Sequence, residues 1–183
     1  GSVGASRRRR APRTARRRLM VRRTELPKYT VPSLSVEDGR TIAAILQQRL
    51  NALNDLALTL KHIHWNVTGP HFIAVHEMID PQVDAVRAMV DQIAERIATL
   101  GVAPVGTPAP SCRTAAGTTT RSAGRCDRAP GALDEVYIGV VTDHREAAAA
   151  TEDLDTVTND LLVGHLHELE LFHWFGAPLS AGG

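Results

Sequence analysis

KHIHWNVTGPHFIAVHEMIDPQVDAVRAMVDQIAER, residues 61–96, is the stretch of sequence that decides both the fold and the candidate site. It carries two pairs of side chains that bind metals, His76 with Asp80 and Asp91 with Glu95. Residues four apart lie on one face of a helix, so each pair could hold one side of a metal ion. An ordinary salted helix surface has the same spacing and is the alternative interpretation.

All four side chains fall on one face of the predicted helix. At roughly 100° per residue, with Asp80 at zero, His76 falls at about −40°, Asp91 at about +20° and Glu95 at about +60°. Apolar residues fill the neighbouring arc, so the acidic face is expected to border the core; they are Phe72, Val75, Ile79, Val83, Val86, Val90, Ile93, Ile97 and Leu100.

The two pairs are too far apart for one ion to touch both on a single helix. Their centres are about 15 residues apart, or roughly 22 Å at a rise of 1.5 Å per residue. If the same helix of a second copy packs antiparallel across a two-fold axis near Ala85 and Val86, the first pair of one chain meets the second pair of the other. Two-fold contacts are the commonest oligomer symmetry. The sequence therefore predicts an intersubunit metal site, formed twice in each dimer.

Helical periodicity continues on both sides of this stretch. Ser35, followed by two acidic residues, predicts a helix start, and Gly69-Pro70 predicts its end. The expected helices cover residues 35–69, 72–100, 133–150 and about 158–176, the last ending at Gly176 and Pro178, and residues 103–131 form a long loop. Four such helices, alternately up and down, predict an all-α four-helix bundle.

Composition divides the chain into a basic tail and an acidic body. A length of 183 residues, 43% hydrophobic and 4% aromatic, indicates one helical domain over residues 36–176, with a short tail over 177–183. Ten of the 21 basic residues are arginines between residues 7 and 23, within the disordered tail expected over residues 1–35, and the other 11 against 20 acidic residues leave −9. Such an arm could bind DNA phosphates without sequence preference; its arginines are Arg7, Arg8, Arg9, Arg10, Arg13, Arg16, Arg17, Arg18, Arg22 and Arg23.

The natural extent of the tail has two interpretations. Gly1-Ser2 looks like a cloning remnant, and Met20 stands where translation could begin, so residues 1–19 are either native or foreign.

Cys112 and Cys126 lack the spacing of a zinc site or a disulfide framework. With no apolar run of bilayer length, a soluble cytoplasmic protein is expected.

Other histidines have a structural and a chemical interpretation. His64 lies on the core-facing stripe of the first helix, where a lone histidine is usually a core residue, but the neighbouring pairs make it a candidate ligand. In the fourth helix, Glu170 and His173 have the Glu-x-x-His spacing of di-iron sites inside a single bundle. Partner glutamates for such a site are not evident, so His165, His167, Glu168, Glu170 and His173 are expected on the surface or in an interface.

The pattern H-W-N-V-x-G-x-x-F-x-x-x-H-x-x-x-D, followed eleven residues later by D-x-x-x-E-R, resembles the Dps family, the DNA-binding miniferritins of starved bacteria. The resemblance covers residues 35–108 and 132–175. It implies a ferritin-like bundle, a dodecameric shell and ferroxidase centres at the dimer two-fold. The implied iron ligands are His64, His76 and Asp80, with Asp91 and Glu95 from the partner subunit, and Trp65 matches a tryptophan beside these centres.

The resemblance also implies an activity. The family oxidises Fe(II), preferentially with hydrogen peroxide, and stores ferric mineral while protecting DNA at the nucleoid. Iron would enter through acidic three-fold pores, for which Asp155 and Asp160 are candidates; an acid-rich helix start is the other interpretation. The alternative function is a structural nucleoid protein that binds DNA through the arginine tail, with metal incidental.

Two segments depart from the family pattern. Relatives place a short helix between the second and third bundle helices, whereas residues 109–130 look like a shifted reading frame that later corrects itself. The ending FGAPLSAGG similarly replaces the expected continuation of the last helix. All five ligand positions survive both departures, so the resemblance implies an intact iron site.

Overall fold

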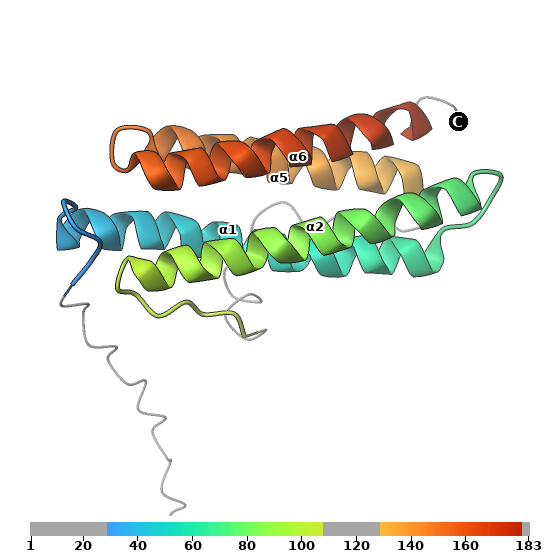
Figure 1. The fold of residues 1–183 in the computed structure, drawn as a ribbon. Helices are drawn as coiled ribbons and strands as arrows, with labels where there is room; N and C mark the ends of the chain where they lie inside the picture. Colours follow the sequence, from blue (N-terminus) through green and yellow to red (C-terminus); the bar gives the residue numbers. More distant parts are fainter. Residues whose placement is uncertain (1–28, 108–128, 181–183) are drawn as a thin grey trace, which may run out of the picture.

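A computed structural model describes residues 29–107 and 129–180, and all regular structure within these ranges is helical. Four helices occur in the order α1 (Val36–Asn66), α2 (Phe72–Thr99), α5 (Ala129–Thr151) and α6 (Thr156–Ser180). They form two layers, with α1 beside α2 and α5 beside α6 (Figure 1). The prediction of an all-α four-helix bundle is confirmed.

The ends of α1 and α2 follow the signals in the sequence. Ser35 caps α1, because its hydroxyl accepts a 3.0 Å hydrogen bond from the Asp38 backbone nitrogen. Gly69 lies in the turn to α2 with φ +98°, and Gly101 follows α2 with φ +85°. These are left-handed conformations that glycine adopts without steric cost. Gly69 therefore allows the short turn that brings α2 back along α1, and Gly101 follows the end of α2.

The core lies between the two layers and is built mainly from aliphatic side chains. Among its fully buried members are Ile42, Leu46, Leu53, Leu56, Leu60, Ile79, Val86, Ile93, Ile97, Leu133, Leu162 and Leu169. Tyr137 is also fully buried, and its hydroxyl donates a 2.7 Å hydrogen bond to Gln82 Oε1. In the two described ranges, no helix is both long enough and apolar enough to span a bilayer.

Two helix boundaries differ from the sequence-based expectation. Helix α6 continues through Gly176 and Pro178 to Ser180, so the end expected at Gly176 is wrong. Gly176 is buried, and a Cβ at this position would lie 3.3 Å from Leu133 Cδ2, so close packing on α5 supports the helix there. Helix α5 begins at Ala129, four residues earlier than expected. A proline in the first turn is compatible with this start, because the backbone N–H that proline lacks would have no hydrogen-bond acceptor within the helix.

Candidate metal centre

His64 and His76 meet where the end of α1 packs against the start of α2. Their rings stack with centroids 3.7 Å apart and planes inclined by 23°. Nδ1 of His64 lies 3.0 Å from the His76 carbonyl oxygen, and Nδ1 of His76 lies 3.1 Å from the His64 carbonyl oxygen. The two residues thus bind each other's backbone, which explains how a histidine can occupy the core-facing stripe of α1.

These reciprocal contacts select one tautomer of each ring. A carbonyl oxygen accepts hydrogen bonds, so each Nδ1 must carry its proton and donate it. Nε2 of each neutral ring then presents a lone pair, as a metal-binding histidine does when its other nitrogen is held by a backbone carbonyl. This arrangement leaves Nε2 of both rings available as a ligand atom, and metal binding by His64 and His76 stays a prediction.

Asp80 completes this cluster on the exposed side. Its Oδ1 lies 3.4 Å from His64 Nδ1 and 2.7 Å from Nζ of Lys61, which comes from α1. The hydrogen bond from Lys61 is the main reason why the pKa of Asp80 is below its usual value, and the nearby histidines act in the same direction. Lys61 was not among the residues expected from the sequence, although it lies one helical turn before His64.

Asp91 and Glu95 lie near the other end of α2, and both are exposed. The acidic face was expected to border the core, and this is wrong: Asp80, Asp91 and Glu95 are all exposed, because the core arc is centred on Ile79 and Ile93. Glu95 also lines a shallow groove of about 380 Å³ between α2 and α6. The carboxylates of α2 therefore face outward, where a second molecule can reach them.

One chain does not assemble a complete metal site. Among residues 29–107 and 129–180, no three His, Cys, Asp or Glu side chains lie close enough together to hold an ion. Helix α2 is continuous from Phe72 to Thr99, so its two ligand pairs stay roughly 22 Å apart by helical rise. The two candidate ligand pairs of α2 therefore lie apart in one chain, and both their role as half-sites and their meeting across a two-fold axis stay predictions.

Aromatic side chains around the first half-site are exposed. Trp65, which by itself would read as a core aromatic, has 70% of its surface exposed. Phe72 was assigned to the apolar stripe of α2, yet it is 39% exposed and lies over His76, with ring centroids 5.1 Å apart. Exposed aromatic residues are enriched in protein interfaces, so this surface is a candidate for contact with another subunit.

The polar residues of α6 divide into buried and exposed groups. His165 is 4% exposed and its Nε2 lies 2.7 Å from Gln92 Oε1, so its expected surface position is wrong. His167 and Glu168 are exposed, as expected. Glu170 pairs with Arg145, and His173 Nε2 lies 2.8 Å from Asp134 Oδ1. The residues of the Glu-x-x-His spacing thus make two separate contacts between α5 and α6, an ion pair of Glu170 and a hydrogen bond of His173.

The two candidate pore residues have different surroundings. Asp155 is held by Arg96 in an ion pair of 2.6 Å, and its side chain is only 12% exposed. Asp160 is exposed and lines the same groove as Glu95. A role in iron entry stays a prediction for both residues. The arginine tail, Cys112, Cys126 and the unusual stretch 109–128 lie outside the described residues.

Comparison with known proteins identifies the class and then the family. The ferritin-like domain family matches residues 43–178, which places the chain among the ferritin-like proteins. The DNA protection during starvation protein of Mycolicibacterium smegmatis is 49% identical over 163 residues, covering 86% of this chain and 88% of that protein. The chain belongs to the Dps family of miniferritins.

Solved structures agree with this assignment. Mycobacterium smegmatis Dps superposes with a TM-score of 0.77 at 48% identity, covering 81% of this chain and 85% of that one. DpsA14 from Streptomyces coelicolor gives a TM-score of 0.73 at 47% identity, covering 82% and 90% of the two chains. The bundle and the order of its helices are therefore those of a Dps subunit.

Proposed function

We propose that this protein is a ferroxidase and iron store that oxidises Fe(II) at intersubunit centres, keeps the ferric product inside a dodecameric shell and so protects DNA. The observation that carries the proposal is the placement of two complementary groups of side chains along α2. At its start, His76 and Asp80 lie beside His64 of α1, and near its end lie the exposed carboxylates of Asp91 and Glu95. Membership of the Dps family supports the same function.

The ligand types suit iron as a substrate. His64 and His76 would bind Fe(II) through Nε2, since neutral imidazole suits this ion, and the carboxylates of Asp80 and the partner's Asp91 and Glu95 would stabilise Fe(III).

With hydrogen peroxide as the oxidant, the electrons and protons of the reaction balance. Two Fe(II) ions each lose one electron, the O–O bond breaks and takes up both electrons with two protons, and two water molecules form. Because both electrons are delivered at one centre, no hydroxyl radical is released.

Lys61 has a defined part in this scheme. Its ammonium neutralises Asp80 at 2.7 Å when no metal is bound. A cation that arrives between Asp80 and the two histidines would displace this contact and take over the same carboxylate oxygen. Lys61 therefore balances the charge of Asp80 without blocking the position that the cation would take.

Removal of the second half-site tests the proposed function. In Asp91→Ala/Glu95→Ala, we expect the oxidation of Fe(II) to fall by at least about 100-fold, because loss of ligands should exceed the 10–100-fold effects of outer-shell changes. The measurement is the formation of ferric absorbance after Fe(II) and peroxide are mixed. Asp84→Ala is the matched control, since Asp84 is an exposed carboxylate on the same helix. Oxidation that persists in the double variant would contradict the proposal.

The arginine tail supports DNA binding as a second activity. Ten arginines within residues 7–23 should give an affinity for DNA that falls steeply with salt, because each neutralised phosphate releases counterions. We expect gel retardation by the full chain across a salt series and its loss in a chain that begins at Met20, while iron oxidation persists. Retardation that is equal in both chains would assign DNA binding to the bundle instead.

A further inference from the structure

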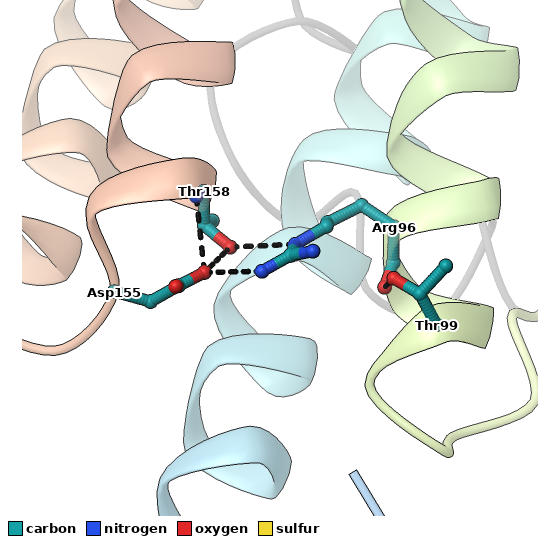
Figure 2. Close-up of polar contacts among 4 residues, drawn as sticks. All are labelled: Arg96, Thr99, Asp155 and Thr158. Atoms are coloured by element: carbon teal, nitrogen blue, oxygen red, sulfur yellow. Dashed lines mark hydrogen bonds and ion pairs between the residues drawn. The ribbon is translucent and has the colours of Figure 1, made fainter. Parts of the chain in front are cut away.

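Arg96 ties the second half-site of α2 to the beginning of α6. Its Nη2 donates a 2.6 Å hydrogen bond to Asp155 Oδ2, and its Nε donates a 3.0 Å hydrogen bond to Thr158 Oγ1 (Figure 2). The side chains of Arg96 and Asp155 are only 14% and 12% exposed. An ion pair this well shielded and bonded through two guanidinium nitrogens restrains geometry more strongly than an exposed pair does.

The acceptor side of this contact is itself fixed by the start of α6. The Asp155 carboxylate accepts a 3.0 Å hydrogen bond from the Thr158 backbone nitrogen and a second bond from the Thr158 hydroxyl, as Figure 2 shows. Burial acts to raise the pKa of Asp155, but the bonds from Thr158 and Arg96 outweigh it and hold that pKa below its usual range. Asp155 is thus an ionised N-cap of α6, and Arg96 binds a carboxylate whose position is already fixed by Thr158.

The position of Arg96 in the sequence links this anchor to the metal ligands. Arg96 directly follows Glu95, and both residues line the groove between α2 and α6. Successive helical residues are turned by roughly 100°, so fixing Arg96 against α6 also fixes the direction in which Glu95 and Asp91 leave the helix. The Thr99 hydroxyl donates a 2.8 Å bond to the Arg96 carbonyl and holds the last turn of α2 together.

We propose that Arg96, held by Asp155 and Thr158, is a positioning residue that aims Asp91 and Glu95 at the metal bound by the partner subunit. The proposal rests on the proposed function, because it assumes that these carboxylates bind iron. Arg96 touches no metal in this scheme. It fixes the rotation of the end of α2 about the helix axis. Metal binding then does not have to orient Asp91 and Glu95 by itself.

The test weakens this contact while keeping the fold, and one of its two variants also keeps the charge. In Arg96→Lys, one ammonium cannot occupy the positions of both Nε and Nη2, whereas Asp155→Asn keeps a residue suited to the N-cap and removes the ion pair. In the assembled protein, we expect the affinity for Co(II), measured anaerobically from its visible spectrum, to fall about 10-fold in each variant. KM for Fe(II) should rise similarly, while kcat stays within about twofold, because the ligands themselves are unchanged.

Coupling and control variants separate positioning from general stability. Because both changes break one contact, Arg96→Lys/Asp155→Asn should lose no more Co(II) affinity than the worse single variant. Arg145→Lys is the matched control, since it alters an ion pair with Glu170 between α5 and α6, and it should leave Co(II) affinity unchanged. If Arg96→Lys fails to assemble, Thr158→Val removes only one hydroxyl from the same contact.

The outcomes distinguish this inference from the proposed function. If Asp91→Ala/Glu95→Ala weakens Co(II) binding but the Arg96 and Asp155 variants do not, the positioning role is wrong and the metal site stands. If the Arg145 control weakens Co(II) binding as much as Arg96→Lys, the effect is general and the positioning role is again overturned. If Asp91→Ala/Glu95→Ala leaves Co(II) binding unchanged, the proposed function itself is wrong.

Discussion

We expect two inactive variants to regain iron oxidation when they are produced together in one cell. The first variant, His76→Ala/Asp80→Ala, lacks the imidazole half-site, and the second, Asp91→Ala/Glu95→Ala, lacks the carboxylate half-site. In a mixed dimer, one centre combines the intact histidines of the second chain with the intact carboxylates of the first. With random pairing, half of the dimers are mixed and each has one intact centre, so roughly a quarter of wild-type activity is expected.

This result requires ligands from two subunits, because a site within one chain cannot be repaired by a neighbour. Each variant produced alone is the baseline, and its oligomeric mass shows whether it still assembles. The matched control combines all four changes in one chain and pairs it with unchanged chains. Such mixed dimers contain no intact centre, so activity there should not exceed that of the unchanged dimers. Absence of any recovery in the mixed assemblies would exclude the intersubunit site.

The sequence was sufficient to predict the bundle and the position of both candidate ligand pairs on α2. Long amphipathic periods, Ser35 before α1 and Gly101 after α2 are local signals, and α1 and α2 form where these signals place them. The pairs at i and i+4 required only the helical repeat. His64 was ambiguous, because its surroundings depend on a contact with His76 that no local pattern encodes; the structure shows this contact as a 3.0 Å bond to the His76 carbonyl, and its role as a ligand stays a prediction.

Long-range contacts account for what the sequence could not predict. The interval around His165 alternates polar and apolar residues, so neither face of α6 was clearly the buried one, and its partner Gln92 lies 73 positions earlier. The extension of α6 past Pro178 depends on Gly176 packing against Leu133 of another helix. Trp65 is apolar yet 70% exposed in the single chain, and the sequence alone does not distinguish a large aromatic residue of the core from one of a protein interface.

His144 and His165 form a buried imidazole pair between α5 and α6. His144 is fully buried, and neither of its ring nitrogens has a hydrogen-bond partner within the described part of the chain. The ring centroids lie 5.7 Å apart, and Arg49 of α1 lies close enough to act on His144 by charge. Arg49 in turn pairs with Asp143 at 3.6 Å. A proton added here would be poorly solvated and close to another cation.

Acid should therefore destabilise the subunit through this pair. Burial, the His165 ring and Arg49 lower the pKa of His144 to about 3, and burial lowers that of His165 to about 4. In the unfolded chain both rings titrate near their usual value of 6.5, so between there and pH 4 the unfolded state binds more protons. The free energy of unfolding has its full value at pH values above the pKa of the histidines in the unfolded chain. It falls as the pH is lowered, by roughly 2 to 3 kcal/mol for each ring at about pH 4.5.

Replacing one ring should remove about half of this acid sensitivity. In His144→Leu, the slope of melting temperature against pH between about 6.5 and 4.5 should fall to roughly half at a fixed protomer concentration, since one of two proton uptake sites is gone. Near pH 7.5 the variant should be at least as stable as the wild type, because an unpartnered polar ring is replaced by an apolar side chain. His167→Leu is the control, as His167 lies exposed on α6 and should leave the slope unchanged. An unaltered slope in His144→Leu would show that acid acts elsewhere, for instance by protonating the Asp155 carboxylate that binds Arg96.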